Sequence, residues 1–165
     1  MNGDLSTTAN LLGDPGRAAI TGGEPQPPTT PVGALAEFYR AFNERDLRLM
    51  EQNWDASPDS VMDNPLGGIM RGWPAIRGVY ERLFSGAARV TVEFFDYTVH
   101  EAADAFWAIG RERGVLAQAG QPDLALAIRT SRLFQRDTTG RWRQAHHHGS
   151  IDDPKLLIDY KARLR

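Results

Sequence analysis

The spacing of apolar residues in the first half of the chain is helical. The first stretch carries apolar side chains at positions i, i+3, i+4 and i+7, namely Leu35, Phe38, Tyr39 and Phe42. This is the spacing of one apolar helix face, so a helix is expected to begin near Val32. Asp46 is expected to cap a second short helix, which carries Leu47, Met50 and Trp54.

A third helix is expected over Trp73–Gly86, where Pro74 suits the first turn and Gly86 suits the end. Its apolar stripe consists of Ile76, Val79, Tyr80, Leu83 and Phe84. The segment between the second and third helices, residues 57–68, indicates a turn, a short strand and a second turn.

After the third helix the apolar period changes to two, which is typical of strands. Four long strands are expected, over Arg89–His100, Asp104–Gln118, Leu124–Asp137 and Arg141–Ile151, followed by a short amphipathic helix. Helices followed by antiparallel strands predict an α+β fold with the helices on one face of a curved sheet. One face of each strand must then contact the helices or line a cavity.

Residues 1–31 differ in composition from the rest of the chain. Their last part, Thr21–Pro31, is rich in proline, glycine and threonine, which suits neither a helix nor a paired strand. We expect residues 1–31 to be a flexible or partner-ordered leader, and residues 32–165 to form a single domain.

Composition narrows the function classes. A net charge of −2 predicts no general attraction to nucleic acid or to an anionic membrane. The chain has no cysteine, which excludes disulfides, thiolate nucleophiles and iron–sulfur clusters and fits a cytoplasmic protein. No stretch approaches the roughly 20 apolar residues that span a bilayer.

Three stretches together resemble the nuclear transport factor 2-like superfamily, which includes SnoaL-like and ketosteroid isomerase-like proteins. They are FYRAFNERD (38–46) followed by Trp54, VMDNPLGGIMRGWPAIRGVYERLF (61–84) and SRLFQRDTTGRWRQAHHHGS (131–150). The last stretch is especially similar to the association domain of calcium/calmodulin-dependent kinase II. The resemblance implies a cone-shaped, curved, mostly antiparallel sheet wrapped on three N-terminal helices, over about residues 33–152.

The resemblance does not fix the reaction. Ketosteroid isomerases have an aspartate base directly before the proline of the strand-turn, where this chain has Asn64. Their two oxyanion acids fall on Phe38 and near Ala127, so that mechanism is not expected. Other relatives use histidine with aspartate, and Asp63 with one of the late histidines could supply that pair.

Strand alternation sorts the three consecutive histidines. With regular alternation, one face of the last strand carries Trp142, Gln144, His146, His148 and Ser150. The related sequences favour this face for the cavity, so His146 and His148 are expected to point inward and His147 outward. Adjacent strand residues alternate in direction, so the three cannot form one metal site, and we expect no metal and no cofactor.

The candidate catalytic residues are therefore His148, His146 and Asp63. The resemblance to the kinase association domain implies a cavity arginine at Arg132, and Arg111 is a similar candidate. These arginines and histidines predict a small organic ligand that bears a carboxylate or resembles an enolate. The other candidate ligand-binding residues are Asn64, Trp54, Tyr80, Trp107 and Gln144.

Two functions remain open on this basis. The first is a cofactor-independent lyase, isomerase, dehydratase or cyclase that uses His/Asp general acid–base chemistry. The second is a non-catalytic ligand-binding or hub-like oligomerisation domain. Structural roles also compete: Arg132 could pair with a carboxylate across the sheet, and Asp63 could cap the turn before Pro65. A homodimer is expected, because such sheets commonly cover their convex face.

Overall fold

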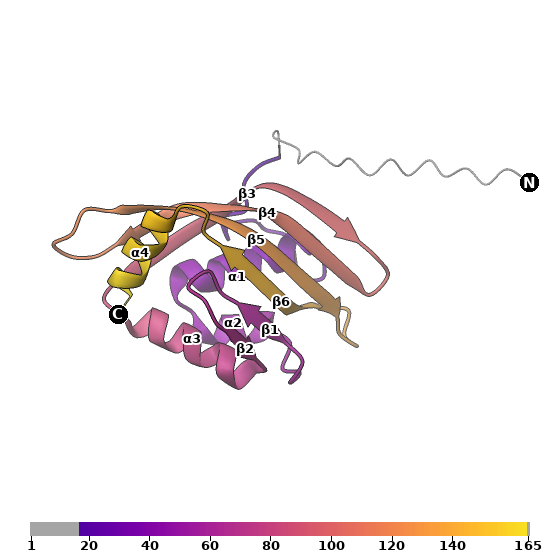
Figure 1. The fold of residues 1–165 in the computed structure, drawn as a ribbon. Helices are drawn as coiled ribbons and strands as arrows, with labels where there is room; N and C mark the ends of the chain where they lie inside the picture. The colour runs from indigo at the N-terminus through magenta and orange to yellow at the C-terminus, as the bar shows by residue number, and fades with distance from the viewer. Residues whose placement is uncertain (1–16, 165) are drawn as a thin grey trace, which may run out of the picture.

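The computed structural model describes residues 17–164, and in this range a curved six-stranded sheet wraps around helices (Figure 1). The helices are α1 (Pro31–Glu44), α2 (Leu47–Asn53), α3 (Trp73–Ser85) and α4 (Pro154–Arg163). The strands are β1 (Val61–Asp63), β2 (Ile69–Arg71), β3 (Arg89–Glu101), β4 (Ala105–Ala117), β5 (Leu124–Arg136) and β6 (Trp142–Ser150).

The first two helices begin at side chains that cap them, of which only Asp46 was predicted. Thr30 Oγ1 accepts a hydrogen bond from Gly33 N at 3.1 Å at the start of α1. Asp46 accepts from Leu49 N at 2.8 Å at the start of α2, as the sequence predicts. These side chains satisfy backbone N–H groups that have no partner within the helix.

The strand order is β2-β1-β6-β5-β4-β3, and only the β1–β6 pair is parallel. The predicted α+β fold with a curved, mostly antiparallel sheet on three N-terminal helices is confirmed. The short strand β2 was not expected. It forms a hairpin with β1 because the glycines Gly67 and Gly68 turn the chain with positive φ angles of 99° and 91°.

The concave face of the sheet packs on α1 and carries the core. Its largest fully buried side chains include Trp54, Trp142, Arg132, Tyr39, Phe94, Phe106 and Phe134. The rings of Phe106 and Phe134 stack with centroids 4.6 Å apart across β4 and β5. The convex face has no helix over it in the described part of the chain (Figure 1).

Residues 17–30 of the predicted leader make contacts with their own domain. Ile20 is buried and exchanges backbone hydrogen bonds with Phe94 at the free edge of β3 (2.8 and 2.9 Å). Further along, the Pro28 carbonyl accepts from Trp142 N at 3.1 Å. The segment therefore covers an edge strand that would otherwise expose unpaired backbone groups. Residues 1–16 lie outside the described residues.

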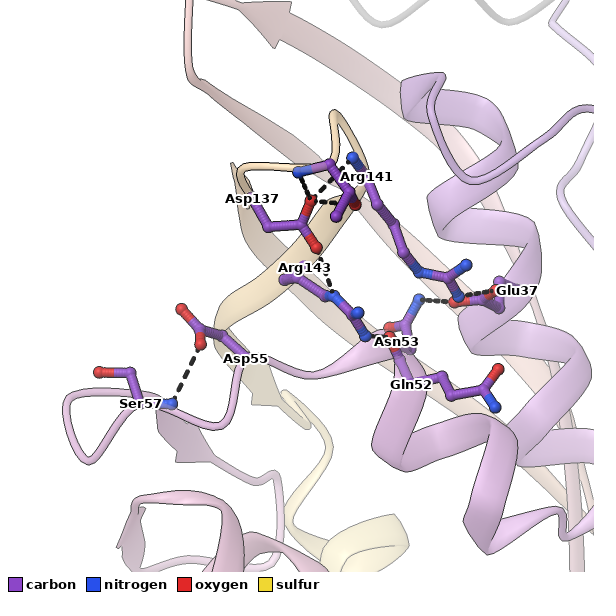
Figure 2. Close-up of polar contacts among 9 residues, drawn as sticks. Glu37, Gln52, Asn53, Asp55, Ser57, Asp137, Arg141 and Arg143 are labelled. Carbon is purple, nitrogen blue, oxygen red and sulfur yellow. Dashed lines mark hydrogen bonds and ion pairs between the residues drawn. The ribbon is translucent and has the colours of Figure 1, made fainter.

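The turn between β5 and β6 closes one end of the molecule against α1 and α2 (Figure 2). Arg141 donates to the carboxylate of Glu37 in α1, and Arg143 donates to the backbone carbonyl of Gln52 in α2. Asp137 accepts from Arg143 Nε at 3.0 Å, which holds that arginine in place. The cavity described below opens at the opposite end of the sheet, beside the β4–β5 turn.

In residues 17–164 no helix is long and apolar enough to span a membrane.

Candidate functional site

A cavity of about 380 Å³ lies between the concave face of the sheet and the helices. Its apolar walls are formed by side chains that include Phe38, Phe42, Met62, Val79, Leu83, Val90 and Ile128. The turn after β1 and helix α4 complete the rim with Leu66 and Leu164. Walls of this kind favour a ligand whose body is apolar.

The cavity contains a buried ion pair between Arg132 and Glu112. Arg132 Nη2 lies 2.8 Å from Glu112 Oε1, and the two side chains are only 1 % and 7 % exposed. Tyr39 Oη donates to the same Glu112 oxygen at 2.8 Å, and burial raises the pKa of Tyr39 well above its ordinary value. The tyrosine therefore stays a neutral donor.

The guanidinium of Arg132 has a hydrogen-bond partner at each of its three nitrogens and an aromatic ring against one face. Its Nη1 donates to Gln144 Oε1 at 2.8 Å, and its Nε donates to Tyr39 Oη at 3.3 Å. The plane of the Phe38 ring lies below it, with the guanidinium carbon 3.5 Å from the ring centroid. Arg132 is thus fixed in position, and Glu112 balances its charge.

His147 is a buried polar side chain of the cavity whose two ring nitrogens both lack a partner within residues 17–164. It is 7 % exposed, it lines the cavity, and neither ring nitrogen has a hydrogen-bond partner among the described residues. Burial, together with the positive charge of Arg132, holds its pKa well below the ordinary value of 6.5. His147 is therefore a neutral imidazole with one donor and one acceptor nitrogen, neither of which is used by another described residue.

The surroundings of His147 fix its orientation. Its ring lies against Phe38, with centroids 6.5 Å apart, and it is the cross-strand neighbour of Arg132 in the β5–β6 register. On the other side, Pro65 approaches Gly149 so closely that a Cβ there would lie 3.0 Å from Pro65 Cδ and 3.4 Å from His147 Nε2. A side chain at position 149 would crowd the imidazole.

The predicted orientation of the histidines is wrong, and a β-bulge is the reason. The β5–β6 register pairs Phe134 with Gln144 but Leu133 with His146, so Ala145 is an extra residue in β6. The bulge shifts the alternation by one residue. Gln144 still points inward, whereas His146 and His148 point to the convex face and His147 points into the cavity.

Asp63 lies on the convex face with the two outward histidines. Its carboxylate is 3.3 Å from His148 Nδ1, because β1 and β6 are parallel neighbours that place Asp63 opposite His148. The His/Asp pair expected from the sequence therefore exists, but outside the cavity. The pKa of His146 is lowered, mainly by partial burial and then by His148.

Two further predicted cavity residues also lie on the convex face. Arg111 pairs with Asp96 there at 3.1 Å, and Trp107 is 39 % exposed and stacks on His100. Both occupy odd-numbered positions of β4, whereas the cavity side of that strand carries the even-numbered ones. The predicted pair of cavity arginines is therefore not brought together.

The remaining candidates divide between the cavity wall and the layer behind it. Arg132, Tyr80 and Asn64 line the cavity as expected. Trp54 and Gln144 are buried but lie behind the wall, where Trp54 Nε1 donates to Tyr80 Oη at 3.3 Å. Their contribution is to hold Tyr80 and Arg132 in place.

Sequence reasoning missed Glu112, His147 and Tyr160 as cavity residues. A signal for Glu112 was available, because it shares strand parity with Phe106 and Leu116. That signal is weak because the same face also carries Ala108 and two glycines. No comparable signal reveals the bulge that turns His147 inward. Tyr160 lies on α4, whose position depends on tertiary packing.

The residues of the cavity do not suggest a metal centre. Within residues 17–164 no three histidine, aspartate or glutamate side chains gather closely enough to hold a metal ion. What the cavity offers is a neutral imidazole beside a fixed guanidinium, inside apolar walls. Such a site can bind an apolar molecule through one uncharged polar group and can accept a proton from it.

A family model of the SnoaL-like domain matches residues 33–154. One similar solved structure comes from Thiobacillus denitrificans ATCC 25259 and is provisionally named a calcium/calmodulin-dependent protein kinase type II association domain. It is 25% identical in sequence, with a TM-score of 0.61, and the match covers 75% of this chain and 96% of that one. A nuclear transport factor 2-like superfamily protein from Salmonella enterica serovar Typhimurium LT2 is 19% identical, with a TM-score of 0.64 over 71% and 84% of the two chains.

A ketosteroid isomerase-like protein from Erwinia carotovora atroseptica SCRI1043 is 21% identical, with a TM-score of 0.60 over 73% of this chain and 92% of that one. No curated protein matches the sequence. The similar structures thus agree on the fold.

Proposed function

The chain belongs to the SnoaL-like domain family, and on that premise we propose that it binds a small, largely apolar organic molecule in the cavity, through an uncharged polar group that contacts His147. The observation that carries the proposal is that His147 lines the apolar cavity while both of its buried ring nitrogens have no hydrogen-bond partner among residues 17–164. A buried polar group without a partner costs roughly 1–3 kcal/mol. A ligand carbonyl or hydroxyl that hydrogen-bonds His147 recovers this cost.

The experiment is a thermal-shift screen of small phenols, ketones and carboxylates at pH 7.5. It is run on the wild-type protein, on His147→Phe and on the matched control His148→Phe. The proposal expects compounds that stabilise the wild type and His148→Phe but not His147→Phe. Compounds that stabilise His147→Phe as well as the wild type would contradict it.

Proton transfer is a second candidate function, favoured by the neutral state of His147 beside Arg132. A neutral imidazole can remove a proton from the carbon next to a ketone, and the electron pair left behind forms an enolate. The imidazolium that forms beside the enolate would balance its negative charge. Return of the proton to a different carbon would complete an isomerisation.

One measurement distinguishes ligand binding alone from catalysed proton transfer. A ketone found in the screen is incubated with the protein in D₂O, and exchange of its α-protons is followed by NMR. Exchange that is faster than in buffer and is lost in His147→Phe supports catalysis. Binding without exchange supports a non-catalytic ligand-binding domain.

We also propose that a second copy of the chain covers the convex face of the sheet. That face exposes large apolar side chains from β4, with Ile109 at 51 % and Trp107 at 39 % of their surface. Exposed apolar side chains gathered on one sheet face favour association. Such a dimer would also enclose the Asp63–His148 pair.

A further inference from the structure

Four formally charged side chains line the cavity, and they fall into two groups by depth. Arg132 and Glu112 are buried and pair with each other at 2.8 Å. Arg82 and Arg163 lie at the rim, where Arg82 is exposed and Arg163 is half-buried. Since the inner pair is neutral as a unit, the net positive charge of the cavity belongs to the rim.

The rim arginines come from two different elements that both line the cavity. Arg82 lies in the last turn of α3 and Arg163 in the last turn of α4, and these two helix ends lie at the same end of the molecule (Figure 1). Arg163 Nη1 donates to the Pro122 carbonyl in the β4–β5 turn at 2.6 Å. This bond holds the guanidinium at the rim rather than in bulk solvent.

Neither rim guanidinium forms an ion pair with a described residue. Two carboxylates on the same helices are already paired: Glu81 contacts Arg77 at 2.7 Å, and Asp159 contacts Lys155 at 2.6 Å. Each arginine is favourably placed at a helix C-terminus, which accounts for its presence in the helix. It does not account for two unpaired arginines from separate helices at one cavity mouth.

We propose that the ligand is an amphipathic acid whose carboxylate lies at the rim between Arg82 and Arg163. This inference rests on the proposed function, which concerns the end of the ligand at His147, and specifies the chemistry of the opposite end. The deep end is uncharged, because a carboxylate beside His147 would have to lose its water next to Glu112, which is itself negative. At the rim a carboxylate keeps part of its water and meets two guanidinium groups.

This arrangement also reverses the orientation expected from the sequence. There the acid was expected to bind at the cavity arginine Arg132, which the structure places in the buried ion pair. Because each nitrogen of Arg132 already donates to Tyr39, Gln144 or Glu112, and Glu112 balances its charge, the carboxylate is displaced outward. The ligand spans the apolar walls between a hydroxyl or carbonyl at His147 and an acid at the mouth.

Two probes of equal length test the inference by isothermal titration calorimetry: 10-hydroxydecanoate, and decane-1,10-diol, which lacks the carboxylate. Both are titrated into the wild type, into Arg82→Gln/Arg163→Gln, and into a control with the same charge change away from the cavity, Arg48→Gln/Arg71→Gln. We expect the wild type and the control to bind the acid about tenfold more tightly than the diol at low salt. In Arg82→Gln/Arg163→Gln the preference falls below about twofold, and 0.5 M salt weakens it in the wild type.

Equal affinity of the wild type for the acid and the diol would overturn the rim site while leaving the proposed cavity function intact. So would a preference for the acid that survives in Arg82→Gln/Arg163→Gln. If neither probe binds the wild type, both the rim site and the proposed function fail. The two failures are therefore distinguishable in a single set of titrations.

Discussion

At the scale of single residues, His147 carries a conflict between stability and function. Its two buried nitrogens lack partners within residues 17–164, so His147 carries a cost that a purely structural side chain would avoid. Buried polar groups of this kind are retained where a ligand or a reaction uses them. Arg132, by contrast, has a partner for each of its three nitrogens and serves to shape the site.

Replacing His147 by phenylalanine should therefore stabilise the empty protein. The change removes two unsatisfied nitrogens and keeps an aromatic ring against Phe38, so we expect the free energy of unfolding to rise by roughly 1 kcal/mol. Urea denaturation at pH 7.5 measures this change. Glu112→Gln is the contrasting variant, since it leaves the buried Arg132 charge unpaired and should destabilise by about 3–5 kcal/mol. A destabilised His147→Phe with wild-type folding would contradict the account.

His147 should also make stability depend on pH. Its pKa in the folded state lies below that in the unfolded state, about 6.5, so the unfolded chain binds the additional proton first. Stability is therefore complete above about pH 6.5 and is lost as the pH falls towards the folded-state pKa, by at most about 1.4 kcal/mol per pH unit from this group.

Denaturation midpoints between pH 5 and 8 test this dependence. The slope should decrease in His147→Phe and persist in His148→Phe. His146, whose pKa is also lowered, contributes a part that His147→Phe retains. An unchanged slope in His147→Phe would show that the imidazole does not titrate as expected.

At the scale of elements, the β5–β6 hairpin decides which side chains reach the cavity. Its bulge at Ala145 turns His147 inward, and its turn is fixed by Asp137. The Asp137 carboxylate accepts from the backbone and hydroxyl of Thr139 (2.8 and 2.6 Å) and from Arg141 N at 3.1 Å. The hydrogen bonds from Thr139 and Arg143 lower the pKa of Asp137.

Asp137→Asn should weaken this hairpin at neutral pH. We expect a loss of roughly 1 kcal/mol, because an amide cannot accept the same set of hydrogen bonds and carries no charge towards Arg143. The contribution is present above the unfolded-state pKa, about 3.9, and is lost as the pH falls through the lowered folded-state value. Denaturation at pH 7 and pH 3 should therefore show a smaller difference from wild type at pH 3 than at pH 7. Asp123→Asn, an exposed residue of the β4–β5 turn, should show no difference at either pH.

The elements themselves could be predicted from the sequence, because they follow from local patterns. Asp46 caps α2, and the period-two stretches become β3 to β6 with ends within one residue of the predicted ones. The side of the sheet that a residue faces is harder to predict from the sequence. One extra residue in β6 is enough to exchange the inward and outward orientations of the three histidines. On β4 both faces carry apolar residues, so parity alone could not separate Trp107 from Phe106.

At the scale of the whole molecule, the sheet has two faces with different roles. The concave face encloses the cavity, whereas the convex face carries the exposed apolar residues and the Asp63–His148 pair. If a second copy covers the convex face, the cavity mouth stays free, because α4 and the β4–β5 turn lie at the end of the sheet. Ligand binding and dimer formation would then use separate surfaces.

The dimer makes a direct prediction. The wild type should have the mass of a dimer at about 10 µM in light scattering coupled to size exclusion, and Ile109→Glu should have the mass of a monomer, since it places a charge in the interface. Ile158→Glu is the matched control, because Ile158 is an exposed apolar residue of α4 (66 %) on another surface. Dissociation by Ile158→Glu, or a monomeric wild type, would contradict this assembly.

The most direct test of the central claim is an NMR measurement of the imidazole nitrogens with and without 10-hydroxydecanoate at pH 7.5. His147→Phe and His148→Phe serve to assign the signals. The account predicts that His147 is neutral before the addition and that its nitrogen signals shift on binding while those of His148 do not. Signals of His147 that remain unchanged at saturation, or a protonated His147 in the free protein, would contradict the account.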